Sequence, residues 1–291
     1  MRREPRAWDD FLTFAHAMLT SRDEDPFYPV LAVLGQTLEE EAHLWLSFLF
    51  VAYCHLGSAW RAWAATGVPQ PLPPCALRWP FYTDRRGLRG GRLAQHVASY
   101  LRAVVGSQRA WLCQGWGADP LENYARFWVQ AQRLWGNGRW AAFKWAEVLK
   151  KVHGWRLSAP DMRLAFCSGP KQGLCWLYDA GATTPVSTLD YLGIDLLQRC
   201  TTAGLTVDWE TLETLLCNWH SLVQGRYYVG CDIDAQYDEI RTIPDVRLQA
   251  PLWGARAATL PAAYCGESAG HGGLDTVRLT AYAATGKVVV R

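Results

Sequence analysis

Residues 135–147 read Trp-Gly-Asn-Gly-Arg-Trp-Ala-Ala-Phe-Lys-Trp-Ala-Glu, and this stretch predicts a glycine-rich turn that opens directly into a helix. Trp140, Lys144 and Glu147 follow at helical spacing and would share one face. The backbone N–H groups and positive dipole end of such a helix start suit a phosphate, and Arg139 would lie at that end. The alternative is an ordinary turn and amphipathic helix in which Lys144 and Glu147 form a surface ion pair.

The stretch lies in the most basic part of a chain whose net charge is only +2. Residues 78–156 contain fourteen Lys and Arg against four Asp and Glu, so this segment carries +10 and the remainder −8. Such an asymmetry indicates a surface for a polyanion. Within it, residues 85–92 hold four arginines and three glycines, which would let the backbone approach a nucleic acid closely. A solvated, mobile loop is the alternative interpretation.

The composition predicts a well-packed protein, because 50% of the residues are hydrophobic and 19% are charged. Sixteen tryptophans can supply both core and base-stacking surfaces. The longest apolar run, residues 44–56, is too short to span a bilayer, so we expect a buried helix and no membrane association. We also expect no signal peptide, because no apolar stretch follows the basic residues at the start. Nine cysteines without a Cys-x-x-Cys pair predict reduced thiols in a cytosol.

Hydrophobic periodicity predicts a mainly α-helical fold. Thr37 and Glu40 form a capping-box pattern at the start of a long helix. The chain is expected to form one helical domain over residues 1–243, with an irregular C-terminal elaboration over 244–291 that packs on the same domain. A short β-like segment at 227–231 and a β-hairpin within 277–291 are also expected. The helices are expected at residues 7–21, 37–65, 93–105, 120–134, 138–152, 171–179, 187–203, 208–223 and 232–240.

Two further groups of residues suit anion binding or acid–base chemistry. Gly169-Pro170-Lys171 begins a helix and places a cation beside a second set of N–H groups, with Arg163 upstream. Asp232 and Asp234 follow the β-like segment and could bind an ammonium group or a divalent metal, or accept a proton. Plain helix initiation explains the first group equally well, and capping with dipole stabilisation explains the second.

Several catalytic motifs are absent from the sequence. The chain has no Gly-x-Ser-x-Gly elbow, no Walker loop, no Gly-x-Gly-x-x-Gly after a strand and no His-Glu-x-x-His. Cys217-x-x-His220 lacks a second pair of zinc ligands. These absences disfavour a kinase, a simple hydrolase, a dinucleotide enzyme and a zinc protein.

Three stretches in their order along the chain resemble a bacteriophage family, the amino acid:DNA transferases grouped with the alpha-glutamyl/putrescinyl thymine pyrophosphorylases. They are residues 135–139 with Glu147, residues 169–174 and residues 216–234. The resemblance implies a helical fold related to the helix-rich DNA glycosylases. It also implies double-stranded DNA carrying pyrophosphorylated 5-hydroxymethyluracil as substrate, with a free amino acid or polyamine displacing pyrophosphate. The expected location is the cytoplasm of the infected bacterial host.

This chemistry assigns the candidate residues to three groups. Cations would stabilise the leaving pyrophosphate, a carboxylate would take the proton of the amine, and tryptophans would stack on a flipped base or fill its gap. No cofactor is assigned; Mg²⁺ held by Asp232 and Asp234 is an alternative that their spacing alone does not indicate. The pyrophosphate group is Arg139, Lys144, Arg163 and Lys171; the catalytic group is Asp232, Asp234 and Glu147; the DNA-binding group is Arg85, Arg86, Arg89, Arg92, Trp135, Asn137, Trp140 and Arg226.

Three other functions remain open from the sequence. A glycosylase-like enzyme would release a free base and leave an abasic site. A non-enzymatic DNA-binding protein would explain the basic segment but gives no reason for Asp232 and Asp234. A virion or assembly protein would use the tryptophans in subunit interfaces.

Overall fold

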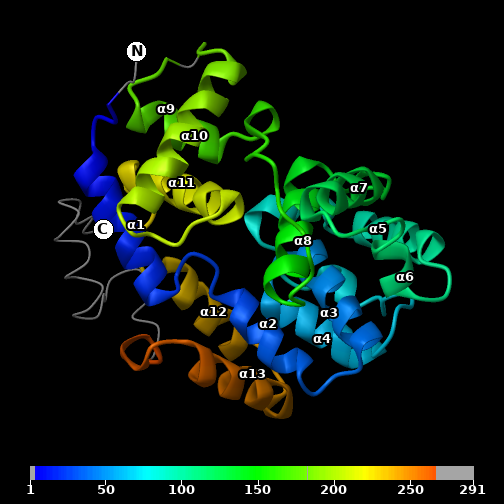
Figure 1. Ribbon diagram of the computed structural model, residues 1–291. Helices are drawn as coiled ribbons and strands as arrows, with labels where there is room; N and C mark the ends of the chain where they lie inside the picture. The colour runs from blue at the N-terminus through cyan, green and yellow to red at the C-terminus, as the bar shows by residue number, and fades with distance from the viewer. Residues whose placement is uncertain (1–3, 182, 267–291) are drawn as a thin grey trace. The chain divides into compact units, whose positions relative to one another are not determined.

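A computed structural model describes residues 4–181 and 183–266, and its regular elements are all helical (Figure 1). Short 3-10 turns lie at Ala76–Arg78, Thr83–Leu88, Leu164–Phe166 and Ala262–Tyr264. The α-helices are α1 (Trp8–Ser21), α2 (Phe27–Gly35), α3 (Glu40–Tyr53), α4 (Leu56–Thr66), α5 (Gly91–Ala103), α6 (Gln108–Leu112), α7 (Pro120–Gln132), α8 (Arg139–Lys151), α9 (Gly169–Leu177), α10 (Val186–Thr202), α11 (Trp209–Val223), α12 (Cys231–Arg241) and α13 (Val246–Thr259).

The predicted fold class, mainly α-helical with a C-terminal β-hairpin, needs correction in its β part. Residues 4–181 and 183–266 contain helices and no strand. The segment 227–231 is a turn instead of β-like: the Cys231 N–H donates to the carbonyl of Tyr228, and Gly230 has a φ of 101°. The hairpin expected within 277–291 lies outside the described residues. The chain after 243 is not wholly irregular either, since Asp245 caps α13 by accepting a hydrogen bond from Arg247 N.

The long helix expected over residues 37–65 is two helices. Cys54, with a φ of 48°, ends α3 in the left-handed conformation, and His55 Nδ1 then accepts a hydrogen bond from Ser58 N to cap α4. The expected capping box does not form either. Thr37 lies just after the end of α2, and its Oγ1 donates to the carbonyl of Leu34 in that helix. The periodicity did not predict α2.

The chain divides into two units of opposite charge. The acidic unit, residues 1–26, 159–235 and 260–291, has eleven Lys and Arg against seventeen Asp and Glu. The basic unit, residues 27–158 and 236–259, has eighteen against ten. The net charges are therefore −6 and +8. The division falls within α12, and the predicted boundary after residue 243 stays a prediction.

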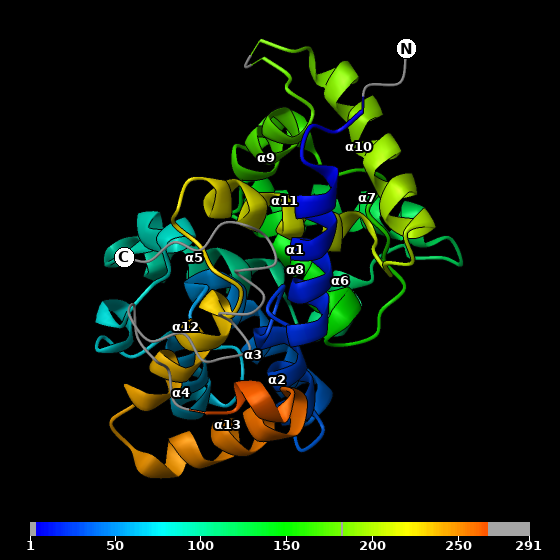
Figure 2. The same cartoon turned by 90° about the vertical axis from the view of Figure 1, so that its left-hand side faces the viewer.

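The core of the acidic unit joins α1, α9, α10 and α11. Helix α9 crosses α11 closely, because Gly173 has no side chain where a Cβ would collide with the Leu216 carbonyl oxygen (Figure 1). Helix α1 lies beside α11 (Figure 2). The rings of Phe11 and Phe14 on α1 both have their centroids 5.5 Å from that of Trp219 on α11. The ring of Phe14 also lies 6.5 Å from that of Tyr227, in the chain that leads into the start of α12.

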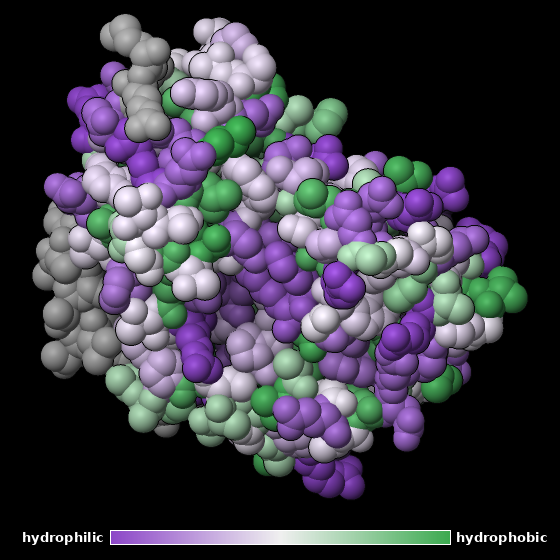
Figure 3. Space-filling model, in the orientation of Figure 1, coloured by the Kyte–Doolittle hydropathy of each residue, from purple (hydrophilic) through white to green (hydrophobic). Residues whose placement is uncertain are grey.

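The core of the basic unit is aromatic. Phe48 of α3 stacks on Tyr100 of α5 with ring centroids 3.8 Å apart, and Trp145 of α8 packs edge-on against Phe127 of α7. Three tryptophans of this unit, Trp45, Trp60 and Trp145, are buried. On the face seen in Figure 3, hydrophobic residues occur in small separate groups among hydrophilic ones. Across the described part of the chain, no helix is both long enough and apolar enough to span a membrane.

Candidate active site

A carboxylate pair bridged by a phenol lies at the start of α12 in the acidic unit. Asp23, which is fully buried, accepts hydrogen bonds from Gly230 N at 2.6 Å and Ile233 N at 2.9 Å. The Tyr227 hydroxyl lies 2.6 Å from Asp23 Oδ2 and 3.1 Å from Asp232 Oδ2. Because a phenol has one proton, Tyr227 donates to one of these two carboxylates at a time.

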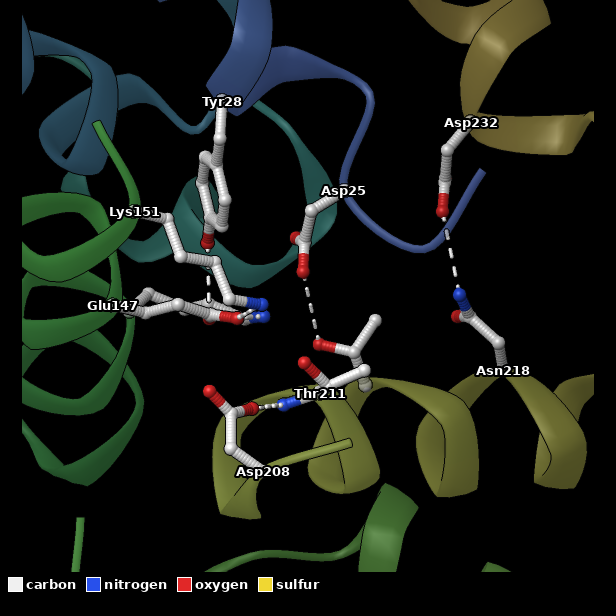
Figure 4. Close-up of polar contacts among 10 residues, drawn as sticks. Asp25, Tyr28, Glu147, Lys151, Asp208, Thr211, Asn218 and Asp232 are labelled. Carbon is white, nitrogen blue, oxygen red and sulfur yellow. Dashed lines mark hydrogen bonds and ion pairs between the residues drawn. The ribbon is translucent and has the colours of Figure 1, made fainter. Parts of the chain in front are cut away.

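The protonation of this group is set by burial. Burial and then the charge of Asp232 raise the pKa of Asp23 well above its ordinary value, against the three hydrogen bonds that favour its ionised form. Burial and the charge of Asp23 also raise the pKa of Tyr227, so the phenol keeps its proton at neutral pH. Asp232 is half-buried and lies 3.4 Å from Asn218 Nδ2 (Figure 4). The arrangement can accept a proton at Asp232 and redistribute it through Tyr227.

Asp234 has a different environment from Asp232. Its side chain is buried and accepts a 2.6 Å hydrogen bond from the Tyr228 hydroxyl. This bond joins the first turn of α12 to the segment before it, so Asp234 helps to hold the turn that carries Tyr227 and Asp232.

Glu147, the third predicted catalytic carboxylate, is fully buried in the basic unit. Lys144 Nζ lies 2.8 Å from its Oε2. Lys151 Nζ lies 2.9 Å from its Oε1, and the Tyr28 hydroxyl donates to Oε2 at 3.0 Å (Figure 4). Burial alone would raise the pKa of Glu147, but the two lysines outweigh it and lower the pKa to about 2. A carboxylate so stabilised is a weak base, and the contacts favour a structural role.

Lys171 lines a cleft of about 570 Å³ in the acidic unit. It follows the start of α9, so the cleft combines a side-chain cation with the N-terminal end of that helix. The cleft also contains the half-exposed indole of Trp176 and an ion pair of 3.3 Å between Arg6 and Asp179. This mixture of cations, an aromatic ring and a carboxylate suits an anion that also carries a polar or flat group.

The other three predicted pyrophosphate ligands have different surroundings. Arg163, with a φ of 53°, is in the acidic unit and places its Nε 3.6 Å from Asp161 Oδ1. Arg139 and Lys144 are in the basic unit, where the guanidinium of Arg139 lies 4.5 Å from the centre of the Phe143 ring. Arg163 and Lys171 therefore belong to one unit, and Arg139 and Lys144 belong to the other.

The predicted DNA-binding residues divide into exposed and buried ones. Arg85 is buried, whereas the side chain of Arg86 lies outside the described residues. Asn137 Nδ2 donates to the Ala131 carbonyl, and Trp140 is half-buried with its ring 5.8 Å from the Arg85 guanidinium. The exposed members of the group are Arg89, Arg92, Trp135 and Arg226, the last of which donates to the Gln224 side chain.

Sequence reasoning missed Asp23, Asn218 and Tyr227 as members of the acidic site. Asp23 lies 207 residues before Gly230 in the chain, so no local pattern could join them. In the described part of the chain, no group of three or more His, Cys, Asp or Glu side chains could hold a metal ion. The alternative of Mg²⁺ at Asp232 and Asp234 stays a prediction.

Comparison with known proteins places this geometry in a family context. Residues 76–228 match the amino acid:DNA transferase family, which is more than half of the chain. A glycinyltransferase of Pseudomonas phage PaMx11 is 25% identical in an alignment that covers 55% of this chain and 62% of that protein. The family match includes Tyr227 and ends shortly before Asp232 and Asp234. This chain belongs to the amino acid:DNA transferase family.

Proposed function

We propose that this protein joins the amino group of an amino acid to the 5-methylene carbon of pyrophosphorylated 5-hydroxymethyluracil in double-stranded phage DNA, displacing pyrophosphate. The family match over residues 76–228 carries the proposal. The relative from Pseudomonas phage PaMx11 is named for glycine transfer, so glycine is the first donor to test. The +8 charge of the basic unit supports a DNA substrate, and the reaction would take place in the infected cell.

The proposed reaction is a substitution at carbon. The amine lone pair forms a C–N bond, the C–O bond to pyrophosphate breaks, and its electron pair leaves on the pyrophosphate oxygen. The attacking amine must be neutral, and the nitrogen releases a proton after it attacks. A protein base and a site for the leaving anion are therefore the two requirements on the chain.

We assign the base to Asp232. Its environment supports the assignment, because Tyr227 contacts its Oδ2 and also contacts Asp23, a carboxyl group with a raised pKa. The hydrogen bonds that Tyr227 and Asn218 donate to Asp232 orient its carboxylate. Asp23 and Tyr227 act as positioning residues in this scheme, since they reach the amine through Asp232.

We assign Lys171 to the leaving pyrophosphate. The cleft at the start of α9 is large enough for this anion, and both its cation and its helix end stabilise negative charge that develops as the C–O bond breaks. Trp176 in the same cleft offers a flat apolar surface for the uracil ring.

The experiment that tests the function is mass analysis of nucleosides. The protein is incubated with DNA containing 5-(pyrophosphoryloxymethyl)uracil and a mixture of glycine, other amino acids and polyamines, and the DNA is then digested. A new nucleoside with the mass of thymidine joined to one amine is expected, together with released pyrophosphate. An abasic product would instead establish a glycosylase, and unchanged nucleosides with retained DNA binding would establish a binding protein.

A further inference from the structure

The turn between α7 and α8 holds an exposed tryptophan by its backbone. Trp135 is 39% exposed, the highest exposure recorded for a tryptophan of the basic unit. Its N–H donates to Ser99 Oγ at 2.9 Å, and its carbonyl oxygen lies 2.6 Å from His96 Nδ1. The next carbonyl, that of Gly136, accepts a 3.1 Å hydrogen bond from Arg85 Nη1. Side chains therefore fix the peptide groups on both sides of Trp135.

Arg85 and His96 are both buried, and their hydrogen bonds determine the state of the imidazole. Arg85 also donates to the Ala52 carbonyl and to His96 Nε2, both at 3.3 Å. Because a guanidinium only donates, His96 accepts at Nε2 and must carry its proton on Nδ1, which donates to Trp135. Burial and then the charge of Arg85 lower the pKa of His96 to about 3, so this neutral tautomer persists at physiological pH.

Gly136 makes the turn possible. Its φ of 87° is in the left-handed region, and a Cβ there would lie 3.1 Å from both His96 Nδ1 and Leu88 Cδ2. Burying a charged group such as Arg85 costs free energy, and an ordinary surface loop does not need one. This turn is held by a buried arginine and a buried histidine, and it also requires a glycine. What the support achieves is one fixed backbone position for Trp135.

The surroundings of Trp135 on neighbouring elements are cationic. Helix α5 contains no acidic residue, and Arg92, Ser99 and Arg102 fall at spacings that share one helix face. Ser99 on this face contacts the backbone of Trp135. The exposed arginines of these segments are Arg89, Arg92, Arg102 and Arg133. An exposed aromatic ring among arginines suits a nucleobase with its phosphates.

We propose that Trp135 stacks on a nucleobase of bound DNA and that Arg85, His96 and Ser99 are positioning residues that hold its turn. The exposed arginines then contact phosphates on either side. The inference rests on the proposed function in taking DNA as the partner, and it reassigns Arg85 from a direct DNA contact to an internal support.

Binding to a short fluorescein-labelled duplex with one 5-hydroxymethyluracil tests the stacking. Trp135→Leu is expected to weaken binding about tenfold and to leave its salt dependence unchanged, because an indole neutralises no phosphate. Arg92→Gln is expected to weaken binding and reduce the slope of log K against log salt by about one. Tyr191→Leu, which removes an exposed aromatic ring of α10, is the matched control and should bind like the wild type. Unchanged affinity in Trp135→Leu would overturn the inference.

A fluorine NMR experiment reports on Trp135 directly. Protein labelled with 5-fluorotryptophan has sixteen indole signals, and the one that is missing in Trp135→Phe belongs to Trp135. Saturating duplex is expected to shift or broaden that signal. A signal that stays unchanged at saturation would contradict stacking even if the leucine variant binds weakly.

A double-mutant cycle tests the positioning role. Ser99→Ala removes one hydrogen bond to the turn and is expected to weaken DNA binding about threefold. Adding it to Trp135→Leu should cost little more, because Ser99 acts through Trp135. Additive losses would show that Ser99 contributes to DNA binding independently of Trp135, and would overturn its assignment as a positioning residue. Arg85→Lys, which keeps the charge but not the planar fork, should follow the same pattern if it folds.

The outcomes separate this inference from the proposed reaction. A protein that binds DNA through Trp135 but makes no new nucleoside would overturn the reaction alone. If the wild-type protein makes the nucleoside and the Trp135→Leu variant binds DNA as tightly as the wild type, the inference alone would be overturned. Failure of the wild-type protein to bind the duplex at all would overturn both.

Discussion

The acidic and basic units each contain a fully buried carboxyl group, and the two groups have opposite electrostatic character. The Asp23 carboxylate in the acidic unit accepts its hydrogen bonds from Tyr227 and two backbone N–H groups. Burial and then the charge of Asp232 raise the pKa of Asp23. Glu147 in the basic unit lies between two lysines, and its pKa is about 2. A shifted pKa is therefore not by itself a sign of catalysis. The group whose partners leave it able to share a proton is the better candidate for chemistry.

Asp232→Asn should produce the largest effect, because it removes the proposed base. We expect the rate of amino acid transfer to fall by about 100-fold to 10,000-fold, the usual contribution of general base catalysis. Binding to DNA should change little. Single-turnover transfer and duplex binding, measured on the same preparations, check both expectations.

Asp238→Asn is the matched control for this substitution. Asp238 is on the same helix, is exposed, and its carboxylate lies 3.7 Å from Arg241 on the surface. It should transfer at close to the wild-type rate. Transfer by Asp232→Asn at the wild-type rate would contradict the assignment of the base. The acidic unit would then no longer differ from the basic unit by a catalytic carboxyl group.

Glu147→Gln should have the next largest effect, on stability. It leaves Lys144 and Lys151 without their carboxylate, and we expect the free energy of unfolding to fall by about 3 kcal/mol, as the lowered pKa implies. A pKa that is lower in the folded state stabilises at pH values above the unfolded value of 4.5. This contribution should disappear as the pH falls from about 4.5 toward about 2. Urea denaturation across this range measures it.

Glu122→Gln provides the control, because Glu122 is exposed in the first turn of α7. Its effect should remain within a few tenths of a kcal/mol. If Glu147→Gln instead keeps its stability but loses transfer at neutral pH, then Glu147 is catalytic and the contrast with Asp23 is wrong.

The sequence predicted the helices that have strong local signals. It did not predict the helix break that lacks such a signal. Helix α8 was expected over 138–152 and spans Arg139–Lys151, because a glycine turn and a regular apolar period mark it. The break at Cys54 was not predicted, since a left-handed residue in an apolar run is usually marked by Gly or Asn and here is a cysteine. Helix α13 was not predicted, and it contains Pro251, a residue type that usually interrupts a helix.

The candidate site could be predicted only where its residues are neighbours in the chain. Asp232 and Lys171 were predicted as candidates because each lies at a recognisable helix start. Asp23 is close to Asp232 only through tertiary folding, and a charge pattern does not reveal that Arg85 turns inward to bind carbonyl groups. Burial decides the role of a charged residue, and burial is a property of the fold.

Replacing one glycine by alanine in each unit should give the smallest effects, with opposite signs. In the acidic unit, the new Cβ of Gly173→Ala meets the Leu216 carbonyl oxygen on α11, and backbone cannot yield as a flexible side chain does. We expect a loss of about 1–3 kcal/mol, as for other overpacked sites. In the basic unit, a Cβ at Gly254 in α13 meets nothing within 4 Å, so Gly254→Ala should stabilise by about 0.5–1 kcal/mol. Urea denaturation of both variants measures the difference. Because Lys171 is on the same helix as Gly173, a stable Gly173→Ala protein would show that α9 can move away from α11, and the cleft that we assign to pyrophosphate would then not be rigidly placed.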